Sequence, residues 1–272
     1  MLFSSSSRVF LAVLAALAWS DAGVAQGGKG SAKPKIVKAK IGKEARTALA
    51  AAGRLSRVRQ GSSVVERQKI LEKAQAAFAK VARKFASQDA VVGEAAFRRG
   101  QLLGRLGRIN EALAAFRRAG DKAKAGFGTR ARLEAGHVQR REKLYPDALE
   151  SYRLAATAGG AYGNRARLWI GKTLINLGRV PDARREWQAL GTDRTMDAYL
   201  RIQAFDDLAM SYVKEKKIGA AKRVIADAED ALSSETAGED KRARVLRKKL
   251  GRMRARKSIA KAAERALESR RR

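Results

Sequence analysis

Small and large apolar residues recur along the middle of the chain with a period close to 36 residues. Gly100, Gly136, Gly171 and Ala209 are separated by 36, 35 and 38 residues. Alanine stands 12 positions after each of them, and a large side chain stands 16 positions after each. These paired positions are Ala112 and Phe116, Ala148 and Tyr152, Ala183 and Trp187, and Ala221 and Ile225. A repeat of this length predicts an array of two-helix units.

The repeated positions have a direct explanation in helix packing. Small residues near the middle of both helices let two backbones approach closely, and the large residue fills the space beside them. Gly107 and Gly178 follow the expected end of a first helix, where a positive φ favours glycine. Pro146 and Pro181 occupy one equivalent position at the start of a second helix, where a missing N–H is tolerated. We therefore expect an all-α fold.

An earlier and more divergent unit precedes these four. Ala74 and Phe78 match the alanine and large positions, 38 residues ahead of Ala112 and Phe116. We expect its first helix at residues 43–59 and its second at about 63–85, with Ser62 or Ser63 as the N-cap. The repeat domain then spans residues 43–238 and contains about five helix pairs.

The C-terminal segment, residues 239–272, predicts a basic amphipathic helix. Its apolar residues recur at helical or near-heptad intervals over residues 241–267, and the other positions are mostly basic. One interpretation is a capping helix that closes the exposed core at the end of the array. The other is a helix that contacts an anionic surface through its basic face. The two interpretations are compatible. The apolar positions are Leu246, Leu250, Met253, Ile259, Ala263 and Leu267.

The N-terminal segment, residues 1–25, has the pattern of a secretory signal peptide. An apolar run at residues 9–17 follows Arg8, and small residues lead to a cleavage position after Ala25. The run is shorter than the ~20 residues that a membrane-spanning helix needs. The alternative is an uncleaved N-terminal anchor. Residues 26–42 are rich in glycine and lysine and predict a basic linker. We expect an exported protein, periplasmic or extracellular, without the lipid-anchored cysteine of a lipoprotein.

Charge is concentrated at the two ends of the mature chain. The sequence holds 59 Lys and Arg against 27 Asp and Glu, a net charge of +32. The net charge is +9 over residues 26–60, +12 over 61–238 and +11 over 239–272. Such ends are attracted to anionic lipids or to anionic envelope polymers. The balance also permits nucleic-acid binding, which we keep as the alternative, although the tails lack the interleaved aromatic residues that stack on bases.

The residues needed for catalysis are mostly missing. The chain has no Cys and only one His, so it offers neither a thiolate nucleophile nor a cluster of histidine metal ligands. Asp206 and Asp207 could form a carboxylate pair, but we interpret them as surface charges that balance nearby basic residues, Lys214 among them. We expect no enzyme activity, no cofactor and no metal.

The small, alanine and large positions resemble those of tetratricopeptide (TPR) repeats over about residues 45–238. The segments A-A-F-A-K-V-A-R-K-F and E-A-A-F-R-R-G-Q-L-L-G-R-L-G also resemble bacterial envelope TPR proteins, of the Tol–Pal-associated and outer-membrane assembly types. The resemblance implies an α-solenoid of about five TPR-like helix pairs with a C-terminal capping helix.

The same resemblance implies a groove that binds extended peptides along the first helices. Its expected lining is rich in arginine, whose planar fork suits carboxylate or phosphate. The alternative is that arginine is only the abundant polar helix former of this chain. We expect a non-enzymatic exported scaffold that binds a protein or peptide partner through a basic concave groove. The expected groove residues are Arg98, Gln101, Arg105, Arg130, His137, Arg140, Arg141, Arg165 and Lys172.

Overall fold

The computed structural model describes residues 41–122 and 127–256, and all the regular structure in these ranges is helical. The expected signal peptide and most of the expected linker lie outside them. No helix in the described ranges has both the length and the apolar character needed to cross a membrane. The helices are α1 (Lys43–Leu55), α2 (Val64–Lys84), α3 (Asp89–Arg105), α4 (Ile109–Lys122), α5 (Phe127–Arg141), α6 (Tyr145–Thr157), α7 (Gly160–Asn176), α8 (Val180–Thr192), α9 (Ala198–Lys214), α10 (Ile218–Ala231), α11 (Ser233–Thr236) and α12 (Lys241–Arg254).

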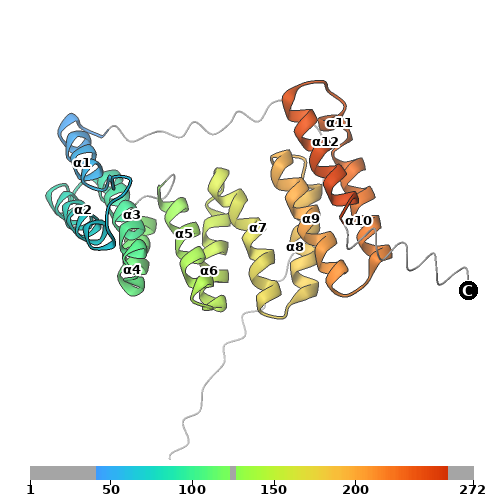
Figure 1. The fold of residues 1–272 in the computed structure, drawn as a ribbon, viewed down its shortest axis with the longest axis horizontal. Coiled ribbons are helices and arrows are strands. Elements are labelled where there is room, and N and C mark those ends of the chain that lie inside the picture. The colour runs from blue at the N-terminus through green and yellow to red at the C-terminus, as the bar shows by residue number, and fades with distance from the viewer. Residues whose placement is uncertain (1–40, 123–126, 257–272) are drawn as a thin grey trace, which may run out of the picture. The chain divides into compact units, whose positions relative to one another are not determined.

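The helices form hairpins that follow one another in chain order (Figure 1). Each helix from α2 to α9 packs mainly against the helices immediately before and after it. The first helices of neighbouring hairpins also touch, α3 against α5, α5 against α7 and α7 against α9. Five pairs, α1–α2 to α9–α10, precede α12, which packs on α9 and α10. The predicted all-α array of helix pairs with a terminal capping helix is confirmed.

The repeated small and large residues meet inside the hairpins. A Cβ added to Gly100 would lie 2.7 Å from Cδ1 of Phe116, and one added to Gly136 would lie 2.6 Å from Cε1 of Tyr152. At Gly171 the added atom would lie 2.5 Å from Cε2 of Trp187. Real Cβ contacts are not this short, so a side chain at any of these three positions would force the facing ring or the backbone to shift. All twelve residues at the small, alanine and large positions of the four repeats are buried.

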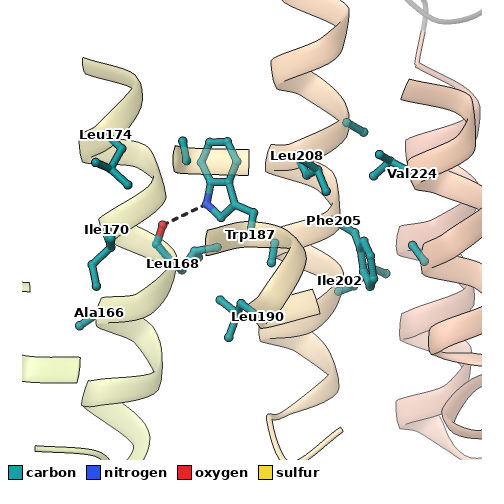
Figure 2. Close-up of a cluster of buried hydrophobic side chains, with 14 of the residues drawn as sticks. Ala166, Leu168, Ile170, Leu174, Trp187, Leu190, Ile202, Phe205, Leu208 and Val224 are labelled. Carbon is teal, nitrogen blue, oxygen red and sulfur yellow. Dashed lines mark hydrogen bonds between the residues drawn. The ribbon is translucent and has the colours of Figure 1, made fainter. Parts of the chain in front are cut away.

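Trp187 shows how the large residue is held. Its ring lies between α7 and α9, and its indole Nε1 donates a hydrogen bond to the Leu168 carbonyl oxygen at 3.2 Å (Figure 2). Trp187 belongs to a buried cluster that runs from α5 to α12 and includes Phe205 and Leu246. A tryptophan can be buried here because its one polar atom has a partner.

The turns between paired helices share one conformation. Gly107 and Gly178, where the sequence predicts a positive φ, have φ of 75° and 74°. The equivalent residues of the other two hairpins are Lys143 and Lys216, with φ of 61° and 59°. The turn therefore keeps its positive φ even in the two hairpins where lysine stands in place of glycine. Pro146 and Pro181 lie in the first turns of α6 and α8, as predicted.

The structure gives the ends of α1, α2 and α12 more exactly than the sequence does. Helix α1 ends at Leu55 rather than residue 59, and the segment up to Ser63 is a turn region. Ser63, not Ser62, caps α2, in a reciprocal capping box with Glu66. Within the segment 241–267, where the sequence predicts a basic amphipathic helix, α12 covers Lys241–Arg254 and has Ala255 as its C-cap. Residues 257–272, including Ile259, Ala263 and Leu267, lie outside the described residues.

Candidate functional site

Most of the expected groove residues lie on one face of the first helices, which we call the first-helix face. It contains four residues of each first helix. Two of them stand six and two positions before the repeated small residue, and the other two stand one and five positions after it. This spacing of four, three and four places them on one side of each helix. None of the sixteen is buried. They are Glu94, Arg98, Gln101 and Arg105 on α3; Arg130, Glu134, His137 and Arg141 on α5; Arg165, Trp169, Lys172 and Asn176 on α7; and Gln203, Asp207, Met210 and Lys214 on α9.

Contacts between neighbouring first helices repeat at a fixed offset along this face. His137 of α5 meets the Trp169 ring of α7 edge-on, with ring centroids 4.7 Å apart. Lys172 of α7, one repeat later, lies with Nζ 3.1 Å from Oδ2 of Asp207 on α9. In both contacts, the first residue stands one position after the small residue of its own helix. The second stands two positions before the small residue of the next first helix. The face is therefore continuous between these three helices.

Basic side chains of α5 and α7 contact aromatic rings on the first helices. The Arg130 guanidinium lies between the rings of Phe97 and Tyr162, 4.8 and 5.4 Å from their centroids. The cationic groups of Arg140 and Lys172 lie 4.7 and 5.0 Å from the centroid of Trp169. Each such contact stabilises the arrangement by about 0.5–2 kcal/mol. These contacts hold long basic side chains in place on the face.

His137 is half-buried rather than solvated. The Tyr152 ring crosses the backbone at Gly136, and its hydroxyl forms a hydrogen bond of 2.7 Å with Nδ1 of His137. Burial, together with the charges of Arg140 and Arg141, lowers the pKa of His137 to about 4. Burial also raises the pKa of Tyr152. The imidazole is therefore neutral at pH 7, and one of its ring nitrogens can accept a hydrogen bond.

A pocket of about 260 Å³ opens where α5, α7 and α9 meet. Three cations, Arg140, Lys172 and Lys214, share its wall with one acid, Asp207. Burial raises the pKa of Asp207, and Lys172 opposes this shift. The remaining lining combines apolar and small polar side chains. These are Trp169, Ile175, Asn176, Trp187, Met210 and Ser211.

Two polar atoms of this pocket have no hydrogen-bond partner. They are Nε of Arg140 and Oδ2 of Asp207, and no other buried side-chain nitrogen or oxygen in the described ranges lacks one. Oδ2 of Asp207 does have an ion-pair partner, because Lys172 Nζ lies 3.1 Å from it. A buried donor or acceptor without a partner costs about 1–3 kcal/mol. Both atoms belong to residues that line the same pocket.

The expected residues of α3 come together in a second, smaller pocket of about 220 Å³. Arg98, Gln101 and Arg105 line it with Ser56 and Phe78 of the first hairpin. Arg141 and Arg165 are exposed and line neither pocket. The expected lining is thus divided between separate sites along the face.

A third pocket, of about 520 Å³, lies away from the first-helix face. It is formed by α4, α5 and α6 and contains none of the expected groove residues. Its charged lining mixes the acids Asp121, Asp147 and Glu150 with Arg117 and Arg132. Among the described residues, no group of three His, Asp or Glu side chains is arranged to hold a metal ion.

Sequence reasoning missed several residues of the α5–α7–α9 pocket. Trp169 and Met210 carried no repeat signal, and Asp207 was assigned to balance basic residues nearby in the sequence. Its partner is instead Lys172 of the preceding first helix, and Asp206 pairs with Arg256 beyond α12. The positions two before and one after each small residue could have identified Trp169, Lys172 and Asp207 as a row.

The arrangement of helices is similar to that of solved structures, among them a protein of TPR-like repeats. One contains the nearly identical TPR-like repeats of a putative kinesin light chain from Podosopora anserina. The match covers 72% of this chain and 97% of that chain, with 12% sequence identity and a TM-score of 0.51. Another is BtubC (BKLC) from P. vanneervenii. This match covers 72% of this chain and 91% of that chain, with 12% sequence identity and a TM-score of 0.50. No protein-family model and no curated protein matches the sequence. The structural likeness shows that the chain has an all-α, TPR-like helical-repeat fold.

Proposed function

We propose that this chain is a non-enzymatic scaffold that binds a protein partner through its first-helix face. The observation that supports the proposal most is the face itself. Sixteen side chains on the first helices of four consecutive hairpins stay out of the core, and each of these helices touches the next one. Seven of the sixteen are basic and three are acidic, which favours a partner segment with acidic or hydrogen-bonding groups. A hairpin array of this kind offers an extended surface rather than a closed catalytic cavity.

Site-specific photocrosslinking in the native cell tests which face the partner uses. A photoreactive residue replaces Arg98 or Arg165 on the first-helix face, and matched variants replace Arg118 or Arg153 on second helices. All four positions are exposed. We expect protein adducts from the first pair and not from the second. Adducts only at Arg118 and Arg153 would place the partner on the opposite helices.

We further propose that the chain is exported and that its basic ends are attracted to anionic envelope surfaces. The proposal rests on the signal-peptide pattern of residues 1–25 and on the charge of the two ends. Each Lys or Arg near such a surface contributes up to about 1 kcal/mol, and salt weakens the attraction. Fractionation of tagged full-length protein tests export, and a cytosolic chain would contradict it. A salt series with anionic vesicles and with DNA then ranks the two kinds of surface.

A further inference from the structure

The α5–α7–α9 pocket carries an inference about the chemistry of the bound partner, and this inference rests on the proposed function. Arg140 Nε is a donor without an acceptor, and Asp207 Oδ2 is an acceptor without a hydrogen-bond donor. The two residues come from helices two repeats apart. They line the same pocket only because α5, α7 and α9 stack on one another. A ligand that satisfies both atoms must offer an acceptor and a donor together.

Simple ions satisfy only one of the two atoms. A carboxylate or a fully ionised phosphate would be attracted by the three cations and could accept from Arg140, but it has no hydrogen to donate to Oδ2 of Asp207. An ammonium group would donate to Asp207 but would face three cations, Arg140, Lys172 and Lys214. An amide carries a carbonyl acceptor and an N–H donor on adjacent atoms and has no net charge.

We propose that this pocket binds an amide group of a peptide partner. The amide carbonyl accepts from Nε–H of Arg140, and the amide N–H donates to Oδ2 of Asp207. The carbon atoms beside the amide pack on Trp169, Ile175 and Met210, which supply the apolar part of the lining. Both polar atoms are covered in the free chain, so the long Arg140 and Lys172 side chains move when the amide enters. The amide comes either from the main chain or from an Asn or Gln side chain of the partner.

The tryptophan indoles provide the readout. The chain has three tryptophans, and Trp169 and Trp187 both line the pocket, whereas Trp19 lies in the expected signal peptide. The probes are acetyl-Ala-Gln-Ala-amide, its Met and Glu counterparts, and the Met peptide with methylated main-chain nitrogens. Each is titrated into the folded chain while the indole N–H signals are followed by NMR. A Trp169→Phe variant assigns the two signals.

We expect the Gln peptide to shift the Trp169 signal and, at high salt where general attraction to the basic face is screened, to bind at least as tightly as the Glu peptide. If the amide comes from the main chain, Gln and Met peptides bind equally and methylation abolishes binding. If it comes from a side chain, the Gln peptide binds more tightly than the Met peptide. Tighter binding of the Glu peptide than of either neutral peptide at high salt would overturn the proposal, and so would the absence of any shift.

Two conservative variants separate hydrogen bonding from charge attraction. Arg140→Lys keeps the charge but removes the planar Nε–H, and Asp207→Asn keeps the shape but removes the charged acceptor. Each weakens binding of the amide probe about five-fold, whereas Arg118→Lys and Asp230→Asn at exposed positions leave it unchanged. If the pocket is simply an anion site, Asp207→Asn tightens binding of the Glu peptide and Arg140→Lys has no effect. Unfolding curves of all variants verify that they are folded.

The failures of the two proposals are distinguishable. Adducts at Arg98 and Arg165 without any probe binding would leave the first-helix face as the partner surface and remove the amide pocket. Probe binding without adducts on this face would leave the pocket and remove the scaffold proposal.

Discussion

The α7–α8 and α9–α10 hairpins are built on the same repeat but are held together differently. In α7–α8, Gly171 lets the Trp187 ring lie directly against the backbone. In α9–α10 the equivalent pair is Ala209 and Ile225, both buried. The fully buried side chain of Arg201 in α9 adds a polar contact to the preceding hairpin: its Nε donates to the carbonyl oxygen of Gly191 in α8 at 2.9 Å.

Arg201 joins three elements through its guanidinium. Besides Gly191 in the last turn of α8, it donates to the carbonyl oxygen of Ala231, the last residue of α10, and to the carboxylate of Glu235 in α11. Carbonyls at helix C-termini lack partners inside the helix and favour a positive charge. In α7–α8 a ring packs on the backbone and makes one indole hydrogen bond, whereas in α9 a buried arginine makes hydrogen bonds to α8, α10 and α11. The two kinds of contact should respond differently to substitution.

The largest effect is expected at Arg201. Arg201→Met keeps most of the side-chain volume but leaves two carbonyls and a carboxylate without their donor. We expect the free energy of unfolding to fall by about 2–4 kcal/mol, because two carbonyl oxygens lose their donor and each such loss costs about 1–3 kcal/mol. Urea unfolding followed by circular dichroism measures it. Arg223→Met, at an exposed position of α10, should stay within about 0.5 kcal/mol of the parent chain. Equal values for the two variants would contradict the role of Arg201.

The next effect is expected at Gly171. Gly171→Ala introduces a methyl group where the Trp187 ring lies, so we expect a loss of about 1–3 kcal/mol from overpacking. Gly104→Ala provides the control, because nothing lies within 4 Å of an added Cβ at this position of α3. Alanine is the better helix former, so the control should gain about 0.5–1 kcal/mol. Thermal unfolding of both variants measures the opposite signs, and a stabilising Gly171→Ala would be inconsistent with the structure.

A smaller and pH-dependent effect is expected at His137, in the α5–α6 hairpin. The fold holds the pKa of His137 at about 4, below its ordinary value of 6.5. The unfolded chain therefore binds more protons between these values, and stability falls as the pH is lowered from 6.5 to 4. We expect a loss of about 1–2 kcal/mol over this range, reduced by the partial exposure of the ring. In a His137→Asn variant, measured by urea unfolding at several pH values, this part of the pH dependence should disappear.

The smallest effect is expected at Ala209. Ala209→Gly imitates the other repeats, but the facing Ile225 has no flat ring to occupy the space. We expect a loss of about 1 kcal/mol from helix propensity alone. Calorimetry can compare it with the parent chain. A gain in stability would mean that this hairpin also favours glycine.

The repeat was readable from the sequence because each hairpin depends on contacts within about 16 residues. Gly100 and Phe116 predicted each other through a fixed spacing, and Gly107 marked its turn. Lys143 and Lys216 adopt the same turn without a glycine, so residue type alone did not identify them.

Contacts between hairpins were harder to predict because they depend on how neighbouring helices are rotated. A basic residue such as Arg201 is usually exposed on a helix, and its burial follows only from the carbonyls that α8 and α10 present to it. The pairing of Asp207 with Lys172 joins two first helices, and no spacing within one hairpin reveals it. The candidate pocket was therefore only partly predictable, through Arg140 and Lys172.

The most direct measurement is a double-mutant cycle that converts the α7–α8 contact into the α9–α10 type. Gly171→Ala, Trp187→Ile and the combined variant are unfolded in urea beside the parent chain. Because the smaller Ile makes room for the methyl group, we expect the combined variant to recover about 1–2 kcal/mol relative to the sum of the single losses. Strictly additive losses would mean that Gly171 and Trp187 do not pack against each other, and the two-helix repeat would lose its physical basis.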